Sequence, residues 1–264
     1  EKAKIVVAEA DLGDAFYESW KRWDTCSLCE QEYHGVVACA LGWAAWKTYL
    51  GRPAVDWAQK SAMSMLATAL RDDARYEEAR VVCLAGLAAC DDNLSFILDL
   101  LDGLASCNRA LGRYDDELEN LREIYAKTEV AYGRDEKTYA AALRYGKVLV
   151  EQSYVHDALL LLNEASLDSE GDLGSEHALV VDLHHAWCLS LWLYHFLGHS
   201  DYRSELRVAV QAPLLLLART QDADQKREIE YNLCMVLTHQ LDWSLDDLEL
   251  DSTDRQIVDR VLAD

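Results

Sequence analysis

The residues best suited to chemistry are three cysteines and a histidine near the N-terminus. Cys26 and Cys29 form a CxxC pair, and His34 and Cys39 each follow after four intervening residues. Thiolates and imidazoles are ligands that Zn²⁺ prefers, and four of them can close a tetrahedral site. The apolar stretch 35–41, however, indicates the start of a buried helix that would turn Cys39 into a core. We therefore predict no bound metal or other cofactor, with zinc at these four residues as the alternative.

Other chemical motifs point away from catalysis. A thioredoxin-like redox role for the CxxC pair is not expected, because no βαβ pattern surrounds it. His184 and His185 are adjacent, so on a helix they diverge by about 100° and cannot chelate one ion together. The sequence has no phosphate-binding loop, nucleophile elbow or HExxH motif. We predict that the protein is not an enzyme, with an α-helical enzyme of unrecognised site as an alternative.

The composition predicts a folded, acidic protein. Of 264 residues, 51% are hydrophobic and 27% are charged, which is enough apolar material for a sizeable core. Asp and Glu number 47 against 25 Lys and Arg, and the resulting net charge of −22 repels phosphate backbones. We therefore predict no nucleic-acid partner. Apolar runs are much shorter than the roughly 20 residues that span a bilayer, so we predict no transmembrane segment.

Cysteine usage and the first residue bear on the compartment. The 8 cysteines lack the density of a disulfide scaffold, and those after Cys39 sit singly among apolar residues. This favours small core residues in a reducing intracellular compartment. The sequence begins with Glu1, which predicts a processed or trimmed N-terminus, so cytoplasm and organelle interior both remain open.

The elements that must position these residues are helices. Only 2 prolines and 12 glycines interrupt the chain, and after Pro53 apolar residues recur at intervals of three and four. Three similar breaks, at 71–79, 110–118 and 151–158, contain a small polar turn followed by acidic residues. Acidic side chains stabilise the N-terminus of a helix. Each break therefore joins two helices.

The helices repeat. Small residues in the helix before each break are Ala67, Ala105 and Gly146, which lie 38 and 41 residues apart, and a further step of 41 reaches Trp187. Such a period is typical of stacked helix pairs. The predicted organisation is an N-terminal helical cap with a Cys-rich turn over 1–52, about four helix pairs over 53–200, and a degenerate repeat with a C-terminal helical cap over 201–264.

Two of the repeats share a set of residues at matching positions. These are Leu104, Ala105, Asn108, Leu111, Gly112, Tyr114 and Leu118, then Tyr145, Gly146, Leu149, Val155, Ala158 and Leu162. Both sets resemble the tetratricopeptide (TPR) pattern, and the 41-residue step resembles its kinesin-light-chain variant. The stretch 42–53 is similar to one that precedes such repeats in uncharacterised algal TPR proteins. The resemblance implies an all-α fold, a right-handed superhelical TPR-like α-solenoid with helical N- and C-terminal caps.

Two positions depart from the family pattern, and one pair of tryptophans needs a separate interpretation. Glu117 stands where the family prefers alanine, at the close contact within a pair, which predicts a splayed second pair. Trp187 stands where the family prefers glycine, which makes the fourth pair degenerate. Trp43 and Trp46 share one helix face, and we expect them to pack against the first repeat rather than anchor a partner.

The resemblance also implies a function. Proteins of this kind bind partners in the concave groove lined by the first helix of each pair. We therefore expect a protein-interaction scaffold or a structural or accessory subunit of a larger assembly, with a basic or extended peptide segment as partner. Ser61, Ser64 and Thr68 would face the groove in the first repeat. The predicted binding residues are Asp99, Asp102, Arg109, Arg144, Lys147, His184 and His185.

Overall fold

A computed structural model describes most of the chain, and the described part is helical. The only β pairing in it is an isolated antiparallel bridge between Thr25 and Glu32. The all-α fold class is thereby confirmed. No helix among the described residues is both long and apolar enough to cross a membrane. The described residues are 5, 19–53, 56–90, 93–175, 177–196, 214, 217, 226–227, 229–230, 233 and 252–263.

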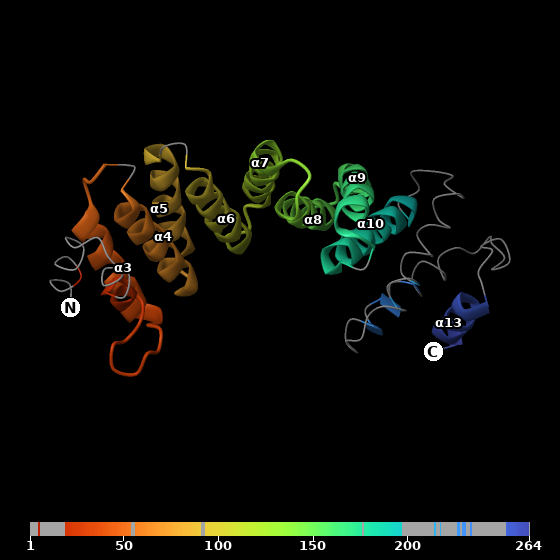
Figure 1. The fold of residues 1–264 in the computed structure, drawn as a ribbon, viewed down its shortest axis with the longest axis horizontal. Coiled ribbons are helices and arrows are strands. Elements are labelled where there is room, and N and C mark those ends of the chain that lie inside the picture. The colour runs from red at the N-terminus through yellow and green to blue at the C-terminus, as the bar shows by residue number, and fades with distance from the viewer. Residues whose placement is uncertain are drawn as a thin grey trace. The chain divides into compact units, whose positions relative to one another are not determined.

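The chain forms two compact units, Glu1–Ile124 and Tyr125–Asp264. In the first unit α3 contacts η1, α3 packs on α4, α4 on α5 and α5 on α6, and α6 also contacts α4 (Figure 1). This is the consecutive packing expected of helix pairs. The first unit contains the 3₁₀ helix η1 (Lys21–Trp23), α3 (Gly35–Tyr49), α4 (Trp57–Asp72), α5 (Tyr76–Ala89), α6 (Leu94–Ala110) and the first part of α7 (Tyr114–Tyr132).

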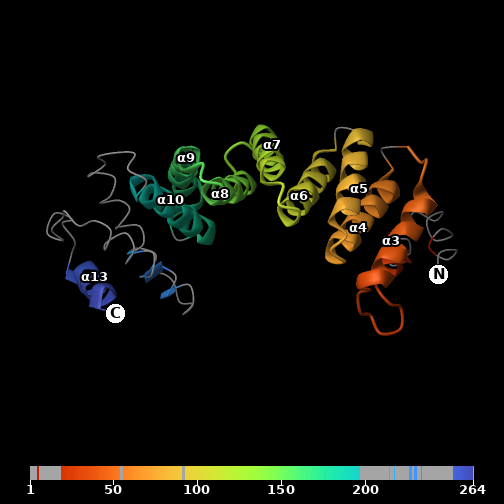
Figure 2. The same ribbon diagram turned by 180° about the vertical axis from the view of Figure 1, so that it is seen from behind.

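The second unit repeats this packing. Helix α9 packs on α8, and α10 contacts both (Figure 2). Arg134 joins the turn before α8 to the end of α9, with Nη1 2.9 Å from Asp168 Oδ1 and Nε 2.8 Å from Asp172 Oδ2. Beyond the end of α7, the helices are α8 (Glu136–Glu151), α9 (Val155–Leu173), α10 (Ala178–Phe196) and α13 (Ser252–Ala263).

Different signals start the two helices of a pair. The first helices α4, α6 and α8 begin after Asp56, Asn93 and Asp135, whose side chains each accept a hydrogen bond from a backbone N–H of the first turn. The second helices α5, α7 and α9 instead carry acidic residues in their first turns, where the helix dipole favours negative charge. The acidic breaks therefore join helices as predicted.

The turn inside each pair has the same backbone conformation three times. Ala74, Gly112 and Ser153 have φ of 59°, 70° and 67°, and they lie 38 and 41 residues apart. The following N–H groups donate to the carbonyls of Leu70, Asn108 and Leu149, in each case over 2.8 Å. The unequal steps reflect helix length, because the 38-residue step spans α5 with 14 residues whereas the 41-residue step spans α7 with 19.

Two of these turns carry a side chain where the left-handed conformation favours glycine. We expect Ala74→Gly and Ser153→Gly each to stabilise the fold by about 0.5–1 kcal/mol, because glycine relieves the steric cost of positive φ. The reverse change, Gly112→Ala, should cost about 1 kcal/mol. Urea unfolding of the three variants measures this; a loss of stability in both glycine variants would contradict the explanation.

Small residues bring the helices of a pair together. Ala67, Ala105 and Gly146 are all buried, as are Ala79 and Ala158 on the partner helices. Gly146 allows the closest approach, since a Cβ there would lie 2.5 Å from Leu162 Cδ2. Trp43 and Trp46 are half-buried against clusters centred on α4, which confirms their expected packing role.

Each end of the described chain has its own core. Before α3, the side chains of Trp20 and Trp23 are buried together with Tyr49, and the ring centroids of Trp20 and Trp57 lie 4.9 Å apart. Toward the C-terminus, Val258 and Val261 of α13 belong to a buried cluster with residues of α9 and α10. The predicted helix over 253–262 corresponds to α13. Most of 201–251, which includes the predicted degenerate repeat, lies outside the described residues.

Candidate functional site: a polar cleft between two first helices

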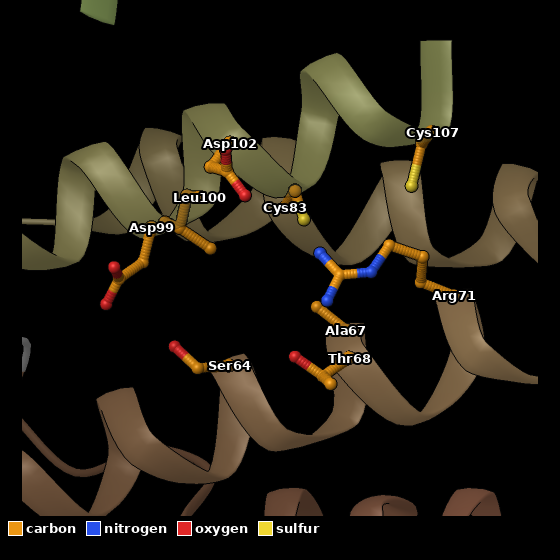
Figure 3. Close-up of a pocket in the computed structure, with 10 residues that line it drawn as sticks. Ser64, Ala67, Thr68, Arg71, Cys83, Asp99, Leu100, Asp102 and Cys107 are labelled. Atoms are coloured by element: carbon orange, nitrogen blue, oxygen red, sulfur yellow. The ribbon is translucent and has the colours of Figure 1, made fainter. Parts of the chain in front are cut away.

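The first unit contains a cleft of about 260 Å³ between α4, α5 and α6 (Figure 3). Helix α4 supplies two hydroxyl groups and a guanidinium, α6 supplies two carboxylates and one thiol, and α5 supplies a second thiol. Ten residues line the cleft: Ser64, Ala67, Thr68, Arg71, Cys83, Asp99, Leu100, Asp102, Gly103 and Cys107.

Helical periodicity explains why these residues meet. Ser64, Thr68 and Arg71 lie at i, i+4 and i+7 on α4 and so share one face. Asp99 and Asp102, at i and i+3, share the facing side of α6. Gly103 keeps the base open, because a Cβ at this position would lie only 3.1 Å from Cys83 Sγ.

The cleft combines both signs of charge. Figure 3 shows the Arg71 guanidinium between α4 and α6, close to Cys83. The carboxylates of Asp99 and Asp102 lie further from Arg71, toward the start of α6. Arg71 Nε is 3.8 Å from Asp72 Oδ1. Burial raises the pKa of Asp99, which signals that its carboxylate is partly withdrawn from water. A ligand that brings a positive group to the carboxylates would offset that desolvation.

The two thiols at the base are poor nucleophiles. Burial, followed by the nearby Cys107, raises the pKa of Cys83 to about 12, and burial also raises the pKa of Cys107. The Arg71 charge opposes both shifts without cancelling them. Both thiols are therefore protonated at neutral pH, whereas nucleophilic catalysis requires the thiolate.

The structure separates the binding residues predicted for the second repeat. Asp99 and Asp102 line the cleft, but Arg109 does not belong to its lining. Arg109 Nε instead donates a 2.6 Å hydrogen bond to Glu117 Oε1 on α7. Glu117 is 3% exposed, and its Oε2 is buried without a hydrogen bond from the described residues. Glu117, which stands where the TPR pattern has alanine, is thus accommodated by an arginine of the same pair.

A second polar contact supports this region. The buried Asn108 accepts a 3.0 Å hydrogen bond from Arg80 Nε on α5 and donates a 2.9 Å one to Asn120 on α7. Arg113, in the turn after α6, also reaches Glu77 of α5 over 2.6 Å. The first and second helix pairs are therefore joined by hydrogen bonds between polar side chains as well as by apolar packing.

The remaining predicted residues belong to the second unit. Arg144 and Lys147 are exposed on α8, one turn apart. His184 and His185 are half-buried on α10, and His184 Nε2 lies 3.5 Å from Glu170 Oε2 on α9. His184 therefore contacts the second helix of the preceding pair.

The four residues of the alternative zinc site do not converge. Cys39 is buried in α3, where its thiol donates to the carbonyl of Ala69 over 3.3 Å, as the apolar stretch predicted. Cys29 and His34 are exposed. The described residues contain no group of three or more His, Cys, Asp or Glu side chains able to hold a metal ion. The absence of a metal itself stays a prediction.

Sequence reasoning missed three residues of the cleft. Arg71 belongs to a predicted break between helices, although it continues the spacing of Ser64 and Thr68 on one face of α4. That spacing is the signal that could have identified it. Cys83 and Cys107 were expected only as core residues, and their buried positions confirm that role while also placing them at the base of the cleft.

Comparisons with known proteins agree with the fold. No family model matches the sequence, and no curated protein matches it. Among solved structures, a kinesin light chain of Podosopora anserina with nearly identical TPR-like repeats is similar at a TM-score of 0.56 and 16% identity, over 86% of this chain and 96% of that one. BtubC (BKLC) of P. vanneervenii is similar at 0.57 and 15% identity, over 86% and 87%. Together with the helix-pair packing, these likenesses show that the chain has a TPR-like repeat fold.

Proposed function

We propose that the protein is a non-catalytic interaction scaffold whose α4–α6 cleft receives a basic side chain from an extended segment of a protein partner. The observation that carries this proposal is the pairing of Asp99 and Asp102 on one wall with the hydroxyls of Ser64 and Thr68 on the other. Carboxylates bind ammonium or guanidinium groups, and hydroxyls bind either backbone carbonyls or N–H groups.

The size and charge of the cleft favour binding of a single peptide residue over binding of a folded protein surface. A volume of about 260 Å³ accommodates a single long side chain with part of its backbone. Arg71, at the α4 wall, supplies a donor for a peptide carbonyl or carboxylate next to that side chain. The overall charge of −22 would attract a basic partner and raise its association rate.

The second unit offers a complementary set of charges. Arg144 and Lys147 are exposed on α8, the first helix of the third pair, and we propose that they contact acidic groups of the same partner. His184 and His185 remain part of the proposed binding set in the fourth pair. A protein of this kind would act as an adaptor or as an accessory subunit of a larger assembly.

We expect Asp99→Lys/Asp102→Lys to weaken partner binding by about 1–3 kcal/mol, because the basic side chain then meets like charge in a partly desolvated cleft. The measurement uses a library of extended peptides in which one fixed position is Lys, Arg, Leu or Glu. Wild-type protein should enrich Lys and Arg, and the double variant should lose that preference. Enrichment should also weaken between about 0.05 and 0.5 M salt.

A matched control separates the cleft from overall charge. Asp115 and Glu119 are exposed on α7 in the same unit, so Asp115→Lys/Glu119→Lys makes an equal change in net charge away from the cleft. This control should retain the preference for Lys and Arg. Equal losses in both double variants, or no preference in the wild type, would refute a specific basic pocket. Arg144→Glu tests the second unit separately and should affect only peptides that carry acidic residues.

A further inference from the structure

Residues 24–33, between η1 and α3, form a hairpin loop that contains the CxxC pair and is joined by one antiparallel bridge, between Thr25 and Glu32 (Figure 1). Tyr33 N–H donates to the carbonyl of Asp24 over 2.7 Å, and Cys26 N–H donates to that of Gln31 over 2.8 Å. At the tip, Glu30 N–H donates to the carbonyl of Cys26 over 2.9 Å. This last bond closes a single turn that starts at Cys26 and includes Cys29.

The turn holds the two cysteines at the separation a disulfide needs. The bond from Glu30 to Cys26 is the i→i+4 bond of one α-helical turn, in which Cα atoms three residues apart lie about 5 Å from each other. Disulfides form over Cα separations of about 4.4–6.8 Å. Both thiols are free, Cys26 is half-buried and Cys29 is exposed. A bond between them therefore requires rotation of the side chains and little movement of the backbone.

The surroundings of Cys26 change its pKa. The causes that lower it are, in order of effect, the backbone N–H groups of Leu28 and Cys29 and the Cys29 side chain, with a smaller contribution from the Tyr33 side chain. Together they outweigh burial and lower the pKa of Cys26. The thiolate, which is the nucleophile in thiol–disulfide exchange, is thereby stabilised at this one sulfur.

Other cysteines of the described chain have the opposite environment. Cys39, Cys83, Cys107 and Cys188 are buried, and burial raises the pKa of each thiol. Cys90 is half-buried, and its thiol donates to the carbonyl of Leu87 over 3.2 Å. Cys90 is therefore the reference thiol for Cys26, because both are half-buried and Cys90 lies outside the hairpin.

We propose that Cys26 and Cys29 form a reversible thiol–disulfide exchange site, with Cys26 as the attacking and Cys29 as the resolving residue. The Cys26 thiolate attacks one sulfur of a small-molecule disulfide RSSR, which forms a mixed disulfide and releases RS⁻. Cys29 then gives its proton to the released thiolate or to solvent and attacks Cys26 Sγ, which releases the second RS⁻. The dithiol loses two electrons, and RSSR is reduced to two thiols.

The charge around the hairpin predicts which disulfides react fastest. Asp24, Glu30 and Glu32 are exposed within the hairpin, and the chain as a whole is strongly acidic. Approach of an anionic disulfide is therefore opposed, and approach of a cationic one is favoured. We expect cystamine to react faster than oxidised glutathione, with the difference reduced by added salt.

The test uses the full reduced chain in buffer with a metal chelator. Limiting cystamine is added, free thiols are alkylated at intervals, and peptides are read by mass spectrometry. We expect modification of Cys26 at least about tenfold faster than of Cys90, followed by an intramolecular Cys26–Cys29 disulfide that reductant reverses. Cys29→Ser should accumulate the mixed disulfide at Cys26, whereas Cys26→Ser should slow reaction at Cys29 to the rate of Cys90.

Tyr33→Phe provides a conservative variant that removes the smallest of these contributions, so it should slow the attack by Cys26 by at most a few-fold without changing the products. Circular dichroism checks that each variant is folded, and the wild-type measurement stands without any variant. The proposal is overturned if Cys26 and Cys90 react at equal rates, or if both hairpin cysteines retain mixed disulfides and never pair with each other. Neither result bears on the α4–α6 cleft, because no partner is present.

Discussion

Arg109→Ala is expected to destabilise the first unit by about 2–4 kcal/mol, because it leaves the carboxylate of Glu117 buried without its cation. Glu117 is 3% exposed and its second oxygen already lacks a hydrogen bond from the described residues. Arg109 is itself 47% exposed, which places the expected cost toward the lower part of the range for broken buried pairs. Urea unfolding of the full chain measures the effect.

The same substitution should cost little once the carboxylate is removed. Alanine occupies the position of Glu117 in the neighbouring pairs, at Ala79 and Ala158, so Glu117→Ala should change stability by less than about 1 kcal/mol. Arg109→Ala/Glu117→Ala should then recover most of the loss. As a control, Arg122→Ala breaks an exposed pair with Glu119 and should cost less than about 0.5 kcal/mol. An equal cost of Arg109→Ala with and without Glu117 would show that the pair is not coupled.

Gly146→Val is expected to destabilise the second unit by about 3 kcal/mol or more. A Cβ at Gly146 would lie 2.5 Å from Cδ2 and 2.6 Å from Cγ of Leu162, a side chain that is itself fully buried. Leu162 cannot move aside without disturbing the packing of α8 on α9, and overpacked cores lose about 1–3 kcal/mol even for smaller additions. A β-branched residue adds further crowding. Thermal and urea unfolding both report the change.

The control for this prediction is another helical glycine of the same unit. Gly171 lies in α9, and a Cβ at this position would have Arg134 Nη2 as its nearest heavy atom, at an ordinary contact distance of 3.8 Å. Gly171→Val should therefore change stability by less than about 1 kcal/mol. In a Leu162→Ala background, Gly146→Ala should cost nothing. A penalty that persists there would place the strain elsewhere than at Leu162.

Much of the fold could be predicted because each repeat obeys local rules. Small residues at Ala67, Ala105 and Gly146 marked the close contacts, and acidic residues after each turn marked the second helices. Residue type indicated the left-handed conformation only at Gly112, because Ala74 and Ser153 adopt the same conformation without being glycine. Periodicity could therefore locate the turns, but residue type alone could not give their backbone geometry.

The candidate site was predictable only in part, for a different reason. Asp99 and Asp102 followed from their position on the first helix of a pair, which sequence spacing defines. Arg109 lies on the same helix, but its side chain is long enough to reach Glu117, and the sequence does not reveal which of several acidic neighbours it contacts. Likewise, Cys83 reaches the cleft because Gly103 leaves room above it, a contact between distant residues that no local pattern encodes.

The aromatic packing before α3 has a consequence for spectroscopy. Five of the 8 tryptophans, at positions 20, 23, 43, 46 and 57, belong to the first unit, so intrinsic fluorescence reports mainly on that unit. Trp20 and Trp57 lie with ring centroids 4.9 Å apart, close enough for their electronic transitions to couple and to add an aromatic band to the far-ultraviolet dichroism. Loss of that band before the helical signal would mark release of the segment around Trp20 while α4 remains folded.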